Sequence, residues 1–168
     1  SALPEKGVVG VVNAADSLES IPACLDLAAR YPFVYAAVGV HPEAAATVDA
    51  ATLPEKLLPF LSEKKVVAIG EIGLDFYYNH SDAEDQRYWF RRQIRLANEL
   101  HMPIVIHARE ADQETMDILK EEGAFSEERC GWFPPPVWAI SVCTGTRRLW
   151  SPIPISAKCP RTLPSATC

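Results

Sequence analysis

The sequence has no apolar run long enough to cross a membrane, no Cys-x-x-Cys pair and no excess of basic residues. A membrane-spanning helix needs about 18 or more consecutive apolar residues. The first six residues also lack the basic-then-apolar pattern of a signal peptide. The five cysteines are odd in number and are not spaced as in a zinc finger. We therefore expect a cytoplasmic protein that has no disulfide framework and no membrane partner.

The net charge of −6 argues against tight binding of duplex nucleic acid, which usually requires a basic face or stripe. A nucleic-acid partner would instead have to be held by a metal ion and a few local contacts. The acidic residues are also distributed unevenly, because all 22 of them precede residue 129. Residues 129–168 therefore have a different composition from the rest of the chain.

This second segment, residues 129–168, is rich in proline, tryptophan and cysteine. Runs such as Pro134-Pro135-Pro136 exclude regular helix and interior strand over most of it. We predict two parts, a folded domain over residues 1–128 and a segment of no assigned fold over residues 129–168. One hypothesis for the abrupt change is translation in a shifted reading frame.

The first part repeats one pattern four times, an apolar β-branched run followed by a helical stretch. The expected strands cover residues 7–13, 33–40, 65–71 and 102–107, and the expected helices cover residues 17–30, 53–62, 83–101 and 111–122. The longest helix is predicted to turn Arg87, Arg91 and Arg95 toward solvent. Strands this uniformly apolar are typical of a parallel sheet that is buried on both faces.

Each expected strand closes with a polar residue, and these are Asn13, His41, Glu71 and His107. They are 28, 30 and 36 positions apart, close to the roughly 31 residues in each unit of a (β/α)8 barrel. A dinucleotide-binding sheet would show a glycine-rich phosphate loop after its first strand, and none is present. The fold class is therefore α/β, an incomplete (β/α)8 TIM barrel of about four βα units.

Active sites of such barrels lie at the carboxyl ends of the strands. Glu71 and His107 are accordingly candidate metal ligands, because a carboxylate oxygen and an imidazole nitrogen suit Zn²⁺, Mn²⁺ or a similar ion. The alternative is structural: Glu71 would cap the sheet or pair with Arg109, and His107 would be a hydrogen-bonded core histidine.

Three further residues are candidate substrate contacts. Arg109 could clamp a phosphate or neutralise a ligand carboxylate, and His41, fixed by the following Pro42, could point at a substrate oxygen. Tyr77 could stack on a nucleobase. For His41 the alternative is a loop-stabilising role, and for Tyr77 it is simple packing.

The sequence resembles the TatD family of metal-dependent deoxyribonucleases over about residues 7–123. The resemblance rests on Gly70-Glu71-Ile72-Gly73-Leu74-Asp75, on Val40-His41-Pro42 and on Ile106-His107-Ala108-Arg109. It implies a (β/α)8 barrel, a centre of two divalent metal ions (Mg, Mn or Zn), and hydrolysis of DNA that is single-stranded or presents its ends. Glu71 would be a metal-bridging carboxylate and His107 a metal ligand, with His41, Arg109 and Tyr77 as substrate contacts.

Three elements of the family pattern do not appear in the sequence: an opening His-x-His strand, a His-Cys-Phe motif and the aspartate of a Thr-Asp-x-Pro motif. The aspartate is the expected general base, so we assign no catalytic residue and expect an N-terminally truncated chain with impaired activity. Two alternatives stay open, an inactive remnant and an amidohydrolase-type enzyme that acts on amides, lactones or small phosphoesters. No specific protein partner is predicted.

Overall fold

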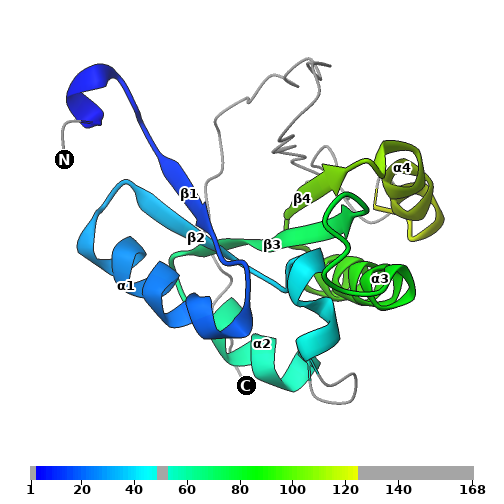
Figure 1. The fold of residues 1–168 in the computed structure, drawn as a ribbon. Helices are drawn as coiled ribbons and strands as arrows, with labels where there is room; N and C mark the ends of the chain where they lie inside the picture. The colour runs from blue at the N-terminus through cyan, green and yellow to red at the C-terminus, as the bar shows by residue number, and fades with distance from the viewer. Residues whose placement is uncertain (1–2, 49–52, 125–168) are drawn as a thin grey trace.

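The computed structural model describes residues 3–48 and 53–124 as a regular alternation of strands and helices (Figure 1). The elements, in chain order, are a 3-10 turn at Pro4–Lys6, β1 (Val11–Ala14), a 3-10 turn at Leu18–Ser20, α1 (Ile21–Arg30), β2 (Val34–Val38), a 3-10 turn at Pro42–Thr47, α2 (Leu53–Leu61), β3 (Val66–Asp75), α3 (Ala83–Leu100), β4 (Ile104–Arg109) and α4 (Asp112–Glu121). The predicted segment 129–168 lies outside the described residues. No helix among these elements has the length and apolar character needed to cross a bilayer.

The four strands form one parallel sheet in the order β1-β2-β3-β4, so each strand pairs with its neighbours in the sequence. Parallel neighbours require a crossover, and here each crossover contains a helix, as in the βα units of a barrel. The four predicted strands and their four helices are therefore present, although β1 begins at Val11 instead of residue 7 and β4 continues past His107 to Arg109. All candidate residues of the site lie at or near the carboxyl ends of β2, β3 and β4.

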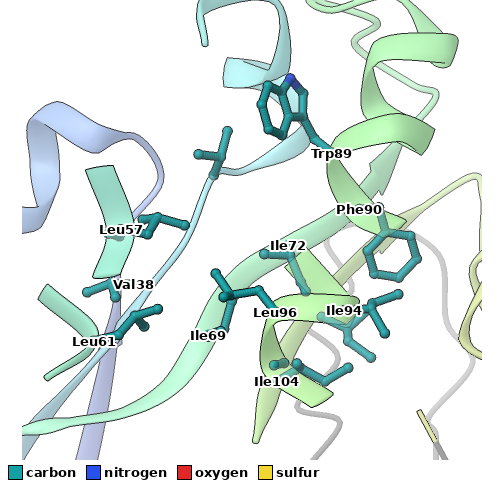
Figure 2. Packing of buried hydrophobic residues seen from close by; sticks show 14 of the residues in the cluster. Val38, Leu57, Leu61, Ile69, Ile72, Trp89, Phe90, Ile94, Leu96 and Ile104 are labelled. Atoms are coloured by element: carbon teal, nitrogen blue, oxygen red, sulfur yellow. The ribbon is translucent and has the colours of Figure 1, made fainter. Parts of the chain in front are cut away.

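The main hydrophobic core lies between the sheet and the helices (Figure 2). Ile69 and Ile72 of β3 are fully buried, as are Ile94 of α3 and Leu57 of α2. Small side chains gather in a separate buried cluster of Ala37, Ala68 and Val105, with Ala14 packed against it. The apolar runs of β2, β3 and β4 therefore do lie in buried strands, as predicted for a sheet covered on both faces. The prediction is wrong for β1, which has no buried residue and in which Val12 is 40% exposed.

Strand β3 is longer than the sequence predicts, because it runs through Asp75 instead of ending at Glu71. Its second half pairs with β4 in register, with Gly73 opposite His107 and Asp75 opposite Arg109. The prediction treated Glu71 as the end of the apolar run, but Ile72 and Leu74 continue it and are both fully buried. Glu71 therefore lies inside the strand, and Asp75 is its terminal polar residue.

Two glycines of β3 allow β4 to approach closely. A Cβ atom on Gly70 would lie 2.6 Å from Cβ of Val105, and one on Gly73 would overlap the carbonyl oxygen of His107. Gly73 also has a φ of +146°, which side-chain-bearing residues rarely adopt. The glycines of the Gly70–Asp75 motif therefore set the spacing between the two strands that carry Glu71 and His107.

Two buried glutamines of α3 bind the ends of β2 and β3. Oε1 of Gln93 accepts the Val40 N–H (2.7 Å), and its Nε2 donates to the Val40 carbonyl oxygen (3.1 Å). Gln86 makes the same pair of bonds to the backbone of Asp75, at 2.8 and 3.0 Å. Each amide thus satisfies a buried donor and acceptor at a strand end, where the sheet itself offers no partner.

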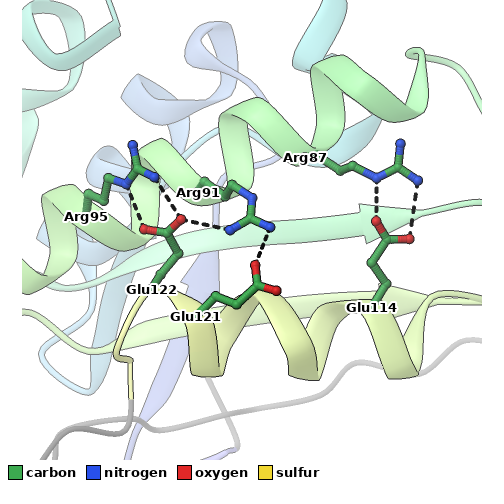
Figure 3. Close-up of polar contacts among 6 residues, drawn as sticks. All are labelled: Arg87, Arg91, Arg95, Glu114, Glu121 and Glu122. Atoms are coloured by element: carbon green, nitrogen blue, oxygen red, sulfur yellow. Dashed lines mark hydrogen bonds and ion pairs between the residues drawn. The ribbon is translucent and has the colours of Figure 1, made fainter.

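Three arginines on α3 bind acidic residues of α4 and Glu122, the residue that follows it (Figure 3). Arg87 pairs with Glu114, Arg91 pairs with Glu121 and Glu122, and Arg95 pairs with Glu122. These arginines were predicted to face solvent. Arg95 does lie at an exposed position, whereas Arg87 and Arg91 are half-buried, and the prediction did not include the acidic partners of any of the three. Their spacing of four residues places them along one edge of α3, where α4 runs beside it.

Replacing Gln93 with methionine should destabilise the fold, because the buried N–H and C=O of Val40 would lose their partners. Unpartnered buried groups of this kind cost about 1–3 kcal/mol each, so we expect a loss of roughly 2–4 kcal/mol in urea unfolding. The exposed Gln113 of α4, changed to methionine, is the matched control. Equal stability of the two variants would contradict the role given to Gln93.

The Arg–Glu pairs between α3 and α4 should make stability fall in acid. Hydrogen bonds from Arg95 and then from Arg91 hold the pKa of Glu122 below its usual value of about 4.5, although burial opposes them. A carboxyl group whose pKa is lower in the folded state than in the unfolded state stabilises the fold fully at pH values above its unfolded pKa. This stabilisation is lost as the pH falls through the pKa of the folded state.

Thermal melts between about pH 6 and pH 3 should therefore show a smaller acid-induced loss of stability for Glu122→Gln than for the wild type, with a cost of about 1 kcal/mol at neutral pH. Glu99→Gln, at an exposed position on α3, should behave like the wild type. An unchanged pH profile for Glu122→Gln would count against the pairing.

Candidate metal centre

Three side chains from neighbouring strand ends converge. His41 follows β2, Glu71 lies on β3 and His107 on β4, and one ligand atom from each lies within 4.8 Å of the others. Two ligand atoms at about 2.1 Å from the same ion can be at most about 4.2 Å apart. Oε1 of Glu71 and Nδ1 of His107, which lie 3.3 Å apart, are already within this limit.

Glu71 and His107 form the centre of this cluster. Nδ1 of His107 lies 3.3 Å from Oε1 of Glu71, yet Oε1 is buried and has no hydrogen-bond partner. A buried carboxylate oxygen without a partner is costly, and a cation would remove that cost. The donor set therefore fits a divalent ion, and the structural alternative in which Glu71 pairs with Arg109 is not observed.

The opposite side of the His107 ring is held by Asp75, to which the sequence analysis assigned no role. Nε2 of His107 lies 2.9 Å from Oδ2 of Asp75, and Asp75 is only 1% exposed. Because β3 continues, Glu71 and Asp75 are separated by an even number of strand positions. That spacing is the signal that could have indicated Asp75, had the strand been extended past Glu71.

The two carboxylates affect the charge of His107. Burial alone lowers its pKa, but Glu71 and Asp75 outweigh burial, so the pKa of His107 is raised. Burial likewise works to raise the pKa of Asp75, but N–H donors from the backbone and the His107 ring leave it below its usual value. The interaction between His107 and Asp75 is therefore electrostatically favourable before any cation binds.

His41 lies against His107, with the two ring centroids 4.3 Å apart in an edge-on arrangement. Burial, and then the positive charge of His107, lowers the pKa of His41, so the ring is neutral. Its Nδ1 accepts a hydrogen bond from the Glu43 N–H at 3.2 Å. A neutral ring that accepts at Nδ1 carries its proton on Nε2, which then donates and cannot ligate a cation.

Arg109 and Tyr77 were both predicted to contact substrate, and the structure places them together. The guanidinium carbon of Arg109 lies 4.1 Å from the ring centroid of Tyr77 and 4.2 Å from that of Tyr78. Such cation–π contacts hold the guanidinium in place. The Tyr77 ring therefore has a partner already, and Tyr78 is a member of this group that the sequence analysis did not single out.

The geometry defines a class, a β/α-barrel protein with a candidate divalent-metal centre at the carboxyl ends of its strands. Comparison with known proteins gives the family. The family model described as TatD related DNase matches residues 1–131. The chain belongs to this family, as the motifs predicted.

Two curated relatives illustrate the relationship. The chain is 43% identical over 109 residues to the uncharacterized metal-dependent hydrolase YabD of Bacillus subtilis. These residues make up 62% of this chain and 41% of the relative. It is 38% identical over 146 residues to the 3'-5' ssDNA/RNA exonuclease TatD of Erwinia tasmaniensis, covering 85% and 52% of the two chains. The chain thus spans about half the length of the curated relatives it matches.

Two solved structures share the fold. The TatD homolog YjjV of Escherichia coli superposes with a TM-score of 0.63 and 32% identity, over 69% of this chain and 45% of that one. A TatD family hydrolase from Entamoeba histolytica superposes with a TM-score of 0.65 and 25% identity, over 72% of this chain and 43% of that one. The predicted incomplete TIM barrel is confirmed by these matches.

Changing Gly73 to alanine should disrupt the centre, because its Cβ would collide with the backbone of the candidate ligand His107. A backbone collision combined with an unfavourable φ should cost at least about 3 kcal/mol in thermal or urea unfolding. Gly10→Ala is the control, since its Cβ would meet only ordinary contacts at 3.8 Å. A Gly73→Ala protein as stable as Gly10→Ala would show that the strands can separate without loss.

Proposed function

We propose that this chain derives from a metal-dependent nuclease that hydrolyses phosphodiester bonds in DNA, with single strands or ends as substrate. The observation that carries the proposal is the approach of Oε1 of Glu71 to Nδ1 of His107, 3.3 Å apart, where Oε1 is buried and accepts no hydrogen bond. Family membership supports it, as does a relative whose name describes an exonuclease acting on single-stranded DNA and RNA.

In this proposal Glu71 and His107 hold a divalent ion, either Mg, Mn or Zn, with two ions per site in a full-length relative. A bound divalent ion supplies an acidified water molecule as nucleophile and neutralises charge on the phosphate. Glu71 provides the negative charge that binds the cation, and His107 provides a nitrogen donor from the adjacent strand. No general base is assigned.

The remaining predicted residues act on the substrate in this proposal. His41 presents Nε2–H, which suits donation to a phosphate oxygen. Arg109, with its guanidinium flanked by Tyr77 and Tyr78, offers N–H groups at its edge for a second phosphate oxygen. The Tyr77 role thus shifts from stacking on a base to supporting Arg109.

We also propose that activity is impaired in this chain, because the aspartate that the family pattern supplies as general base does not appear in the sequence. An inactive remnant that keeps the fold is the second candidate. The cytoplasmic location and the division at residue 128 stay predictions.

The assay measures nucleotide release from single-stranded DNA with Mn²⁺ or Mg²⁺, comparing the wild type with Glu71→Gln and His107→Gln. Each change removes a ligand atom, so we expect the rate to fall by about 100-fold or more, as losses at metal sites do. Glu63→Gln, at an exposed position after α2, is the matched control.

The outcome separates the two candidates. Release that depends on the metal and on both residues supports the nuclease. A wild type that binds Mn²⁺ in calorimetry but releases no nucleotide supports the remnant.

A further inference from the structure

We propose that Asp75 is a positioning residue that fixes the proton of His107 on Nε2 and so presents Nδ1 to the cation. This inference rests on the proposed function, because it concerns how the same site binds its metal. Asp75 belongs to the Gly70–Asp75 motif, but the motif alone gave it no role in metal binding.

The Asp75 carboxylate has both oxygens engaged. Oδ1 accepts the backbone N–H groups of Tyr77 and Tyr78, each at 3.0 Å. Oδ2 lies 2.9 Å from Nε2 of His107. A carboxylate only accepts hydrogen bonds, so Nε2 of His107 must be the donor.

The two ring nitrogens of His107 therefore have different roles. With the proton on Nε2, the lone pair of a neutral ring is on Nδ1, which is the atom facing Glu71. Histidine ligands in metal proteins usually donate their other nitrogen to a carboxylate or carbonyl, which orients the ring and selects the tautomer. Asp75 has the geometry for that role.

The position of Asp75 is itself rigid. It is 1% exposed, and Gln86 binds both its N–H and its C=O. The same carboxylate caps the turn that places Tyr77 and Tyr78 around Arg109. One side chain therefore links the metal ligand to the arginine that is proposed to contact phosphate.

Asp75→Asn is the informative change, because it keeps the shape and reverses one hydrogen bond. The amide oxygen must face the two N–H donors of Tyr77 and Tyr78, which leaves the NH₂ group facing Nε2 of His107. Nε2 would then accept, and the proton would move to Nδ1, where a cation needs the lone pair. The turn should keep its structure while the metal ligand is blocked.

The first measurement is the affinity for Mn²⁺ or Zn²⁺ alone, by calorimetry. We expect Asp75→Asn to bind 10–100-fold more weakly than wild type, the usual effect of losing such a partner. Asp117→Asn, a partly exposed position on α4, is the control and should bind as wild type does. Wild-type affinity in Asp75→Asn would overturn the inference.

The second measurement is the tautomer of His107 from ¹⁵N chemical shifts of the metal-free protein, at a pH where the ring is neutral. We expect Nε2–H in the wild type and Nδ1–H in Asp75→Asn. An Nδ1–H ring in the wild type overturns the inference, and this arm needs no folded variant. If metal affinity and tautomer respond as expected but the wild type releases no nucleotide, the result supports the inactive remnant over the active nuclease, and the role of Asp75 stands.

Discussion

The site depends on the two buried amides that α3 extends to the sheet. Gln93 binds the backbone of Val40, immediately before His41, and Gln86 binds the backbone of Asp75. A strand end has backbone groups that the ladder does not pair, and an amide side chain offers one donor and one acceptor in the right geometry. The residues around the candidate metal centre are therefore fixed by α3, the helix that packs against β3.

Much of the fold could be predicted from the sequence, because each element has a simple hydrophobic pattern. The strands are short, continuous apolar runs, and the helices between them show apolar residues at helical spacing. The extra length of β3 could not be predicted in this way, since Glu71 interrupts the apolar run although it lies inside the strand. A polar residue inside a strand looks like the end of the strand when its tertiary partner is unknown.

The partners of charged residues on helices were also beyond sequence reasoning. Arg91 and Arg95 fall on the polar side of α3, and only the docking of α4 shows that Glu122 lies there with a side chain that is 9% exposed. The candidate site was predicted better. His41, Glu71 and His107 do converge, because the carboxyl ends of neighbouring parallel strands meet. Asp75 was missed because its role depends on the same misplaced end of β3.

The glycines of β3 give the family motif a second meaning. Gly70 and Gly73 are required because the backbone of β4 occupies the space where their side chains would be. These two glycines of the family motif therefore reflect the close approach of the β3 and β4 backbones and do not depend on any reaction. A chain that kept the architecture but lost its chemistry would display these glycines as clearly as a working enzyme would, so the motif establishes ancestry and shape, and catalysis has to be established from the ligands.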